Sequence, residues 1–192
     1  MGRIVVSEIV SLDGVVEDLT GEEGFARGGW FNGIGAEDRA AWAEVECAEA
    51  LAAAALLLGR RTYEYLAARW PERTGEWADR LNGLPKYVVS ATAKELGWAN
   101  STVLRGDALD EVTKLKDRVD GDVVVYSSRR LVHLLVEHDL VDEVRLVVYP
   151  VVLGAGARIF GGTGAAKPVR LVDARTLGTG LAYLTYLTGP SV

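Results

Sequence analysis

Short apolar runs alternate with amphipathic, helix-like segments along most of this 192-residue chain. The hydrophobic periodicity predicts strands at residues 3–11, 55–58, 86–90, 101–105, 122–126 and 144–152, and helices at 37–53, 61–68, 76–82, 109–119 and 129–137. Two more strands, 169–175 and 181–188, follow with no helix between them. The alternation predicts an α/β fold with a parallel sheet between helices, and the last pair predicts an antiparallel extension at one edge. Because no linker or repeat interrupts the pattern, we expect a single domain over residues 1–192.

Two of the predicted strand-to-helix junctions carry a pair of arginines. The junction residues are Gly59, Arg60 and Arg61 in "ALLLGRRTYEYL" and Ser127, Ser128, Arg129 and Arg130 in "VVVYSSRRLVHLL". A serine hydroxyl before a helix is expected to cap its free N–H groups. Arginine is unfavourable there, because the start of a helix carries a partial positive charge.

A bound anion would remove this electrostatic conflict. Ligands of doubly wound sheets bind at the carboxyl ends of the strands, where both junctions lie. Phosphate held by helix N–H groups and arginines would offset the repulsion, so two such junctions favour a dinucleotide with an additional 2′-phosphate. Taken alone, either arginine pair is equally compatible with a solvated surface.

Composition excludes several functional classes. The formal net charge of −6 argues against a general nucleic-acid or membrane-surface binder. The single cysteine, Cys47, excludes an intrachain disulfide and fits a reducing compartment. The longest apolar run, residues 50–58, is far shorter than the roughly 20 residues that span a bilayer, and the N-terminus lacks the features of a signal peptide. We therefore expect a cytoplasmic protein with a small-molecule ligand.

Other motifs of known chemistry are missing or incomplete. His133 and His138 are five positions apart, roughly 140° around a helix, so they cannot share a metal, and we expect no metal site. The stretch "LGAGARIF" lacks the third glycine of a dinucleotide-binding fingerprint, and neither a P-loop nor a G-x-S-x-G elbow occurs. Residues 12–35 form a long glycine-rich segment, which predicts a lid or binding loop. Trp30, near its end, is the tryptophan that we expect to contact substrate.

Four stretches, in this order, resemble a known family: "VSEIVSLDGVVED", "LLLGRRTYE", "KYVVS" and "LVDEVRLVVYPVVLGAGARIF". They are similar to the dihydrofolate reductase-like family, specifically the reductase domain at the C-terminus of the bifunctional deaminase–reductase of riboflavin biosynthesis. The resemblance runs from residue 4 to about residue 187. It implies a mixed, mainly parallel eight-stranded sheet, NADPH as cofactor, hydride transfer to a pteridine-like or ribosylaminopyrimidine-like substrate, and a homodimer.

The resemblance also implies roles for individual residues. The cofactor would be held by Gly59, Arg60, Arg61 and Thr62 at the first junction, by Lys86 and Ser90 beside the 2′-phosphate, by Ser127, Ser128, Arg129, Arg130 and Leu131 at the pyrophosphate, and by Gly154 and Gly156 in the turn that borders it. Family members have glycine at the position of Ser127, and a side chain there limits the close approach of backbone to ligand.

Three residues are candidates for chemistry. Ser11 and Asp13 match the turn that lies beside the nicotinamide in the family, although an Asp-Gly pair is equally well explained as a plain turn. Dihydrofolate reductases proper hold the pterin with a carboxylate at the start of the helix after the lid, where Glu37 and Asp38 lie. Acidic residues favour helix starts for electrostatic reasons alone. The alternatives to a reductase are a non-catalytic, regulatory NADPH- or nucleotide-binding protein and a flavoprotein.

Overall fold

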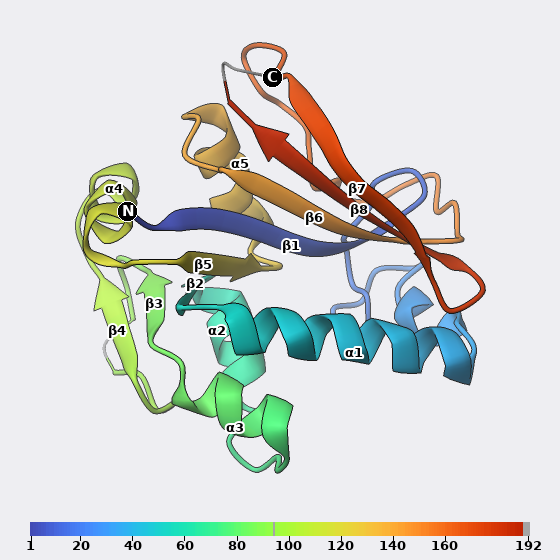
Figure 1. The fold of residues 1–192 in the computed structure, drawn as a ribbon, viewed down its shortest axis with the longest axis horizontal. Helices are drawn as coiled ribbons and strands as arrows, with labels where there is room; N and C mark the ends of the chain where they lie inside the picture. Colours follow the sequence, from blue (N-terminus) through green and yellow to red (C-terminus); the bar gives the residue numbers. More distant parts are fainter. Residues whose placement is uncertain (94, 190–192) are drawn as a thin grey trace.

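The computed structural model describes residues 1–93 and 95–189. An eight-stranded sheet, in the order β4-β3-β2-β5-β1-β6-β8-β7, forms the middle layer (Figure 1). The strands are β1 (Arg3–Ser11), β2 (Ala55–Gly59), β3 (Lys86–Val89), β4 (Ser101–Leu104), β5 (Asp122–Tyr126), β6 (Glu143–Tyr149), β7 (Val169–Leu177) and β8 (Leu181–Thr188). Strands β1 to β6 pair in parallel, and β8 and β7 extend the sheet in antiparallel fashion beyond β6.

Five α-helices and one 3-10 helix complete the described fold. Their bounds are η1 (Trp30–Gly33), α1 (Ala36–Ala52), α2 (Arg60–Ala67), α3 (Glu76–Gly83), α4 (Ala108–Arg118) and α5 (Arg129–Glu137). None of the helices in residues 1–93 and 95–189 has both the length and the apolar character that crossing a membrane requires.

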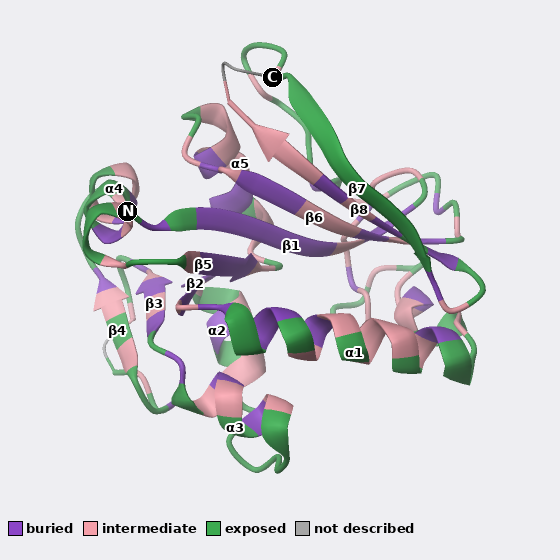
Figure 2. Ribbon diagram, in the orientation of Figure 1, coloured by how far each residue is buried: buried purple, intermediate pink, exposed green. Residues whose placement is uncertain are grey.

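The two faces of the sheet bury separate hydrophobic clusters. On one face, Ile4 and Val6 of β1 pack with residues of α4 and α5, and on the other face Val5 packs with residues of α1, α2 and α3. This arrangement follows from the two-residue period of strands, which sends successive side chains to opposite faces. Figure 2 shows the result as continuous burial along β1 and β5. These central strands are therefore a rigid support for whatever lies at their ends.

A third hydrophobic cluster lies near the carboxyl end of β1. Trp30 packs edge-on against Tyr149 of β6 at a ring distance of 5.5 Å, and Leu177 and Leu181 of the β7–β8 hairpin join them. The segment after β1 therefore packs against the sheet rather than standing away from it. Strand β7, by contrast, is exposed along nearly its whole length (Figure 2).

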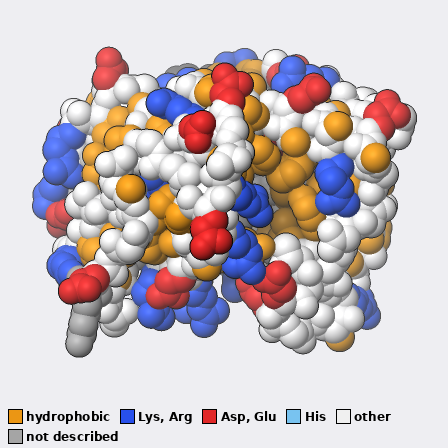
Figure 3. All heavy atoms as spheres, turned by 90° about the horizontal axis from the view of Figure 1, so that it is seen from below, with side chains coloured by type: hydrophobic (Ala, Val, Ile, Leu, Met, Phe, Trp, Pro, Cys, Tyr) orange, Lys and Arg blue, Asp and Glu red, His pale blue; other side chains and the backbone are white. Residues whose placement is uncertain are grey.

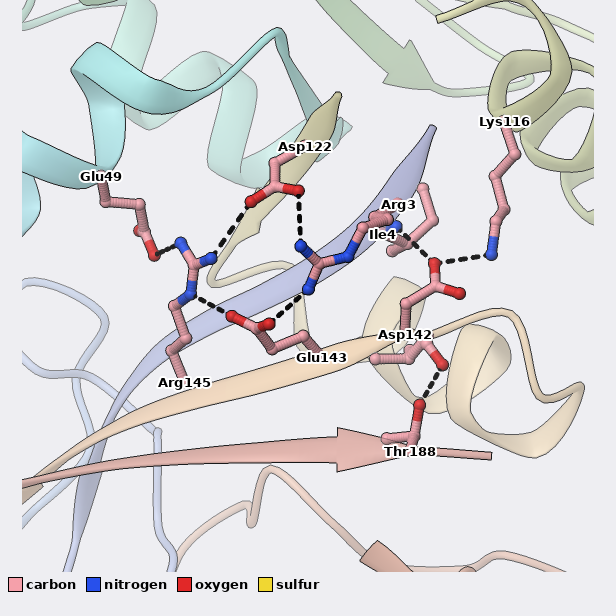
Figure 4. Close-up of polar contacts among 10 residues, drawn as sticks. Arg3, Ile4, Glu49, Lys116, Asp122, Asp142, Glu143, Arg145 and Thr188 are labelled. Atoms are coloured by element: carbon pink, nitrogen blue, oxygen red, sulfur yellow. Dashed lines mark hydrogen bonds and ion pairs between the residues drawn. The ribbon is translucent and has the colours of Figure 1, made fainter. Parts of the chain in front are cut away.

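Arg145 of β6 joins three acidic side chains at the amino ends of the central strands (Figure 4). Its guanidinium lies 2.7 Å from Glu49 Oε2, 2.6 Å from Glu143 Oε1 and 3.1 Å from Asp122 Oδ2. Arg3 bridges the same Asp122 and Glu143 from a more exposed position. The network connects β1, β5, β6 and α1, so a buried guanidinium holds the end of α1 against the sheet.

The fold class predicted from the sequence is confirmed, including the antiparallel strands at the edge. Most predicted elements begin and end within about two residues of the observed ones. The largest difference is β6, predicted as 144–152, which ends at Tyr149. Pro150 follows it, and proline has no N–H group to continue the hydrogen-bond ladder.

We expect Arg145→Met to lower the free energy of unfolding by about 3–5 kcal/mol, because it leaves buried carboxylates without their counter-charge. Arg3→Met is the matched control. Its side chain is 46% exposed, so the loss should stay below about 1 kcal/mol. Urea denaturation at pH 7 measures both values. Equal effects of the two substitutions would contradict the view that Arg145 is the buried centre of the network.

Candidate functional site

A cavity of about 790 Å³ opens where β1, β2 and β5 end. Both arginine-bearing junctions line it, together with Ser7 to Ile9 of β1, part of the loop that follows β1, and residues of α1 and α3. The face drawn in Figure 3 is hollowed, with hydrophobic side chains inside the hollow and charged side chains around it. The sheet order explains the position, because the carboxyl ends of adjacent parallel strands meet at one edge.

The two junctions are bonded directly to each other. Ser128 Oγ accepts a hydrogen bond from the backbone N–H of Gly59 at 2.9 Å, and the backbone N–H of Ser128 donates to Thr62 Oγ1 at 3.1 Å. The prediction that serine caps the following helix is therefore wrong, since the Ser128 hydroxyl serves Gly59 and α5 has no side-chain cap. The starts of α2 and α5 form one continuous wall.

Backbone strain is concentrated at the second junction. Ser127 and Ser128 have φ values of 50° and 57°, in the left-handed region that glycine adopts readily and other residues enter at a cost of about 1 kcal/mol or more. Two consecutive residues of this kind make a tight turn of the backbone, and both line the cavity. The serine at position 127 therefore does not prevent the glycine-like turn.

Three of the four junction arginines have no acidic partner. Arg60 Nη1 lies 3.4 Å from Glu64 Oε1 on the exposed surface. None of the other ion pairs found within the described residues, 1–93 and 95–189, includes Arg61, Arg129 or Arg130. All four line the cavity at the positive ends of two helices. This wall is a concentrated positive surface in a chain of net charge −6.

Buried carboxyl groups and aromatic rings lie elsewhere on the same cavity wall. Glu8 and Glu46 are 5% and 8% exposed, and burial raises the pKa of Glu8 to about 8. Burial, and then the neighbouring carboxylates of Glu49 and Glu8, raise the pKa of Glu46 well above its usual value. Both shifts favour the protonated, uncharged form of these carboxyl groups.

Two buried polar atoms on this wall have no hydrogen-bond partner among the described residues. They are Glu8 Oε2 and Trp77 Nε1. Buried polar groups nearly always have partners, so unpartnered ones at a cavity are consistent with a polar ligand. The aromatic rings beside them suit a flat, uncharged heterocycle.

Ser11 and Asp13 lie outside this lining and hold a turn together. Asp13 Oδ1 accepts hydrogen bonds from the Leu153 N–H at 3.0 Å and from Ser11 Oγ at 2.8 Å, and Oδ2 accepts one from the Gly154 N–H at 2.8 Å. These bonds, that from Leu153 first, lower the pKa of Asp13 to about 2. Gly154 and Gly156 both have positive φ, and a Cβ on Gly156 would lie 2.7 Å from Val15. The structure thus gives these four residues a structural function.

Asp38 and Trp30 are also outside the cavity lining. Asp38 Oδ1 accepts hydrogen bonds from the N–H groups of Thr179 at 2.6 Å and Gly180 at 3.1 Å, in the β7–β8 turn. The indole N–H of Trp30 donates to the carbonyl of Glu17 at 3.1 Å. The neighbouring Phe31, which the sequence analysis did not select, lines the cavity instead.

Lys86, Ser90 and Leu131 are not brought to the cavity either. Lys86 is fully buried, and its ammonium donates to the carbonyls of Leu84 at 2.8 Å, Asn82 at 2.9 Å and Ala99 at 3.1 Å. Burial lowers the pKa of Lys86 to about 8. Ser90 Oγ accepts from two N–H groups of its own turn, and Leu131 is part of the core.

The sequence analysis missed Glu8, Glu46 and Tyr126. A faint signal existed for Glu8, because it is a charged residue within the otherwise apolar and small-residue run "IVVSEIVS" of a central strand. Glu46 gave no such signal, since glutamate is common in helices and α1 contains four of them. Only the packing of α1 on the sheet shows that its side chain turns inward.

The sheet order and the position of the cavity define an α/β protein of the dihydrofolate reductase-like class. A family model for the RibD C-terminal domain matches residues 3–183, so the chain belongs to the RibD C-terminal domain family. The uncharacterized protein YyaP of Bacillus subtilis (strain 168) is 28% identical over 137 residues, which cover 68% of this chain and 72% of YyaP. The resemblance inferred from the four motifs is confirmed.

Solved structures share the fold. A protein of Shewanella sp. PV-4 assigned to riboflavin biosynthesis superposes with a TM-score of 0.71 at 18% identity, covering 98% of this chain and 99% of the other. Enterococcus faecalis dihydrofolate reductase complexed with NADP(H) and RAB-propyl gives 0.58 at 12% identity, covering 98% and 97%. The Thermotoga maritima diaminohydroxyphosphoribosylaminopyrimidine deaminase/5-amino-6-(5-phosphoribosylamino)uracil reductase gives 0.63 at 12% identity, covering 97% of this chain and 56% of the other. At these identities the likeness shows the fold alone.

We expect Lys86→Met to lower the free energy of unfolding by about 3 kcal/mol, because three buried carbonyl groups lose their donor. The affinity for NADPH should stay the same, since Lys86 is fully buried and does not itself line the cavity, although its ammonium lies 4.3 Å from the ring of Trp98, which does. The control Lys114→Met, on the exposed surface of α4, should change stability by less than about 0.5 kcal/mol. Chemical denaturation and cofactor titration test both points. A large loss of NADPH affinity without loss of stability would show that Lys86 acts on the cofactor.

Proposed function

We propose that the protein is an NADPH-dependent reductase that transfers hydride to a pteridine-like or ribosylaminopyrimidine-like substrate, as in riboflavin biosynthesis. One observation carries the proposal: arginines without acidic partners stand at the positive ends of two helices on the wall of one cavity. A fold would not keep this arrangement for its own stability, because each cation opposes the helix dipole. A ligand with several phosphate groups removes the conflict.

The residues of the cavity fit such a dinucleotide. The first turn of α5 and the side chains of Arg129 and Arg130 would hold the pyrophosphate. Arg60 and Arg61, at the start of α2, would hold the 2′-phosphate that distinguishes NADPH from NADH. Enterococcus faecalis dihydrofolate reductase, which shares the fold, is complexed with NADP(H). The bound cofactor would supply the hydride, and the chain would orient the rings and exclude water.

The aromatic and carboxyl part of the cavity would take the substrate. Trp42, Trp77 and Phe31 offer flat apolar surfaces, and the unpartnered polar atoms offer hydrogen bonds to ring nitrogen and oxygen atoms. The reductase of Thermotoga maritima that shares the fold is named for a substrate of this kind, 5-amino-6-(5-phosphoribosylamino)uracil. This compound and 6-methyl-7,8-dihydropterin are therefore the first substrates to test.

A nucleotide-binding regulatory protein without turnover is the second candidate. Ser127, in a strained conformation where the resembling family has glycine, is the observation that favours it. Steady oxidation of NADPH in the presence of either test substrate would exclude this alternative. NADPH binding without oxidation of any pyrimidine or pteridine would support it.

We further propose that two copies associate through β7, and that the protein acts in the cytoplasm, where its one cysteine stays reduced. Strand β7 is the free edge of the sheet and exposes Val169, Leu171 and Val172 at 46%, 49% and 44%. Exposed apolar edge strands readily pair with another strand. Sedimentation equilibrium should give twice the mass of the chain, and Leu171→Lys should restore the monomer.

We expect at least one of Arg129→Glu and Arg130→Glu to weaken NADPH binding tenfold or more, which corresponds to about 1.4 kcal/mol. The free protein should be as stable as the wild type or a few tenths of a kcal/mol more stable, because glutamate suits a helix start. A variant that binds NADPH more weakly but is no less stable than the wild type would show that the arginine serves ligand binding and not the stability of the fold.

Arg170→Glu, on exposed β7, is the matched control and should leave NADPH binding unchanged. Fluorescence titration with NADPH and NADH measures the affinities, and wild-type protein should prefer NADPH. Equal affinities for the two cofactors, or unchanged NADPH binding in both variants at α5, would contradict the phosphate site.

A further inference from the structure

Glu46 has an unusual environment for a glutamate. It lies in the middle of α1, is 8% exposed, and lines the cavity. None of the ion pairs found among residues 1–93 and 95–189 includes its carboxyl group. A carboxylate buried without a counter-charge is so unfavourable that the group keeps its proton instead.

Glu49, one turn further along α1, strengthens this effect. Its Oε2 atom lies 2.7 Å from Arg145 Nη1 and forms an ion pair with it. The negative charge of Glu49 then opposes a second negative charge on Glu46. The network in Figure 4 therefore does more than join α1 to the sheet, because it fixes a charge beside the cavity.

The same stretch of α1 provides a place for a flat ring. Trp42 precedes Glu46 by four positions, which is one helical turn, and both line the cavity. The indole N–H group of Trp77 is buried there without a hydrogen-bond partner among the described residues, and its ring lies 5.7 Å from that of Trp42. A polar heterocycle that bonds to it and packs on Trp42 would lie next to the Glu46 carboxyl.

We propose that Glu46 is the proton donor to the substrate, and that Glu49, held by Arg145, is a positioning residue that keeps the proton on Glu46. The proposal deepens the reductase function and rests on it. Glu8 also lines the cavity, but it lies on β1 and not on the helix that carries Trp42. Glu46 combines the buried proton with the ring-binding side chains of its own helix.

The chemistry balances as a two-electron reduction. Hydride from the reduced nicotinamide adds to the carbon of a C=N or C=O bond of the substrate, and the nicotinamide is oxidised. The electron pair of the double bond moves to the nitrogen or oxygen, which takes the proton from the Glu46 carboxyl as its O–H bond breaks. Glu46 is left as a carboxylate and regains a proton from water after the product leaves.

Other ionisable groups around the cavity also influence the pKa of Glu46. Besides Glu8 of β1, they are Glu17 and Glu23 of the loop, Arg69 and Arg73 after α2, Tyr126 of β5, and the two arginine pairs. Phosphates bound to the arginine pairs would cancel much of that positive charge. The acidic groups then dominate near Glu46, so bound cofactor should favour the protonated form further.

The first test compares Glu46→Gln with Glu44→Gln, a control on the exposed side of the same helix. With 5-amino-6-(5-phosphoribosylamino)uracil or 6-methyl-7,8-dihydropterin as substrate, E46Q should bind NADPH normally and lose at least about 100-fold in kcat, the usual contribution of a general acid. E44Q should behave as the wild type. Wild-type kcat should fall at high pH as Glu46 loses its proton, and E46Q should lack this fall.

The second test addresses Glu49. Removing its negative charge lowers the pKa of Glu46, so Glu49→Gln should move the alkaline fall in kcat to lower pH while retaining the activity seen below it. A purely structural effect would lower kcat at all pH values and leave the pH dependence in place. That result would overturn the positioning function of Glu49.

A third measurement needs no turnover. The infrared difference spectrum between the wild type and E46Q at pH 7 should contain the carbonyl band of a protonated carboxyl and no carboxylate bands. Carboxylate bands would overturn the proposal. Turnover by E46Q equal to the wild type would overturn the donor function of Glu46 while leaving the reductase function intact, whereas wild-type protein that binds no NADPH or reduces neither substrate would reject both.

Discussion

The hydrogen bonds that Ser128 makes to Gly59 and Thr62 are the constraint on which the site depends. They join two strand-to-helix junctions that are almost 70 residues apart in the chain. Without them the starts of α2 and α5 would be two separate positive helix ends. With them, both helices present N–H groups and arginines to one cavity, and the strained turn at Ser127 becomes a part of the wall. The central strands, buried on both faces, keep this geometry rigid.

Charge is divided within the cavity. Arginines occupy the junctions, where phosphate is expected, and buried carboxyls and aromatic rings of β1, α1 and α3 line another part. The division has a physical cause, because Arg145 pairs with Glu49, whereas none of the ion pairs among the described residues includes Glu46. A dinucleotide and a neutral heterocycle could therefore be held side by side by different forces, electrostatic attraction for the first and stacking with hydrogen bonds for the second.

The fold could be predicted almost completely from the sequence, because most strands and helices have their own hydrophobic period and are separated by turn residues. The sequence also drew attention to Arg60, Arg61, Arg129 and Arg130, which contradict the helix dipole, and the structure brings all four to one cavity. That they hold phosphate there is our proposal. The acidic part of the site could not be predicted from the sequence. Asp13 and Asp38 were the obvious carboxylates, but side chains in turns and at helix starts readily bind backbone N–H groups, and both do so here. Burial of Glu46 depends on how α1 packs, which no local pattern encodes.

We propose that the two junctions form one phosphate site. Backbone amide NMR shifts during a titration with NADP⁺ can decide this, because they report each N–H group separately. The amides of residues 59–62 and 127–130 should shift together, with one common dissociation constant, while those of β7 should not move. Shifts confined to one junction, or two different dissociation constants for the two junctions, would contradict it.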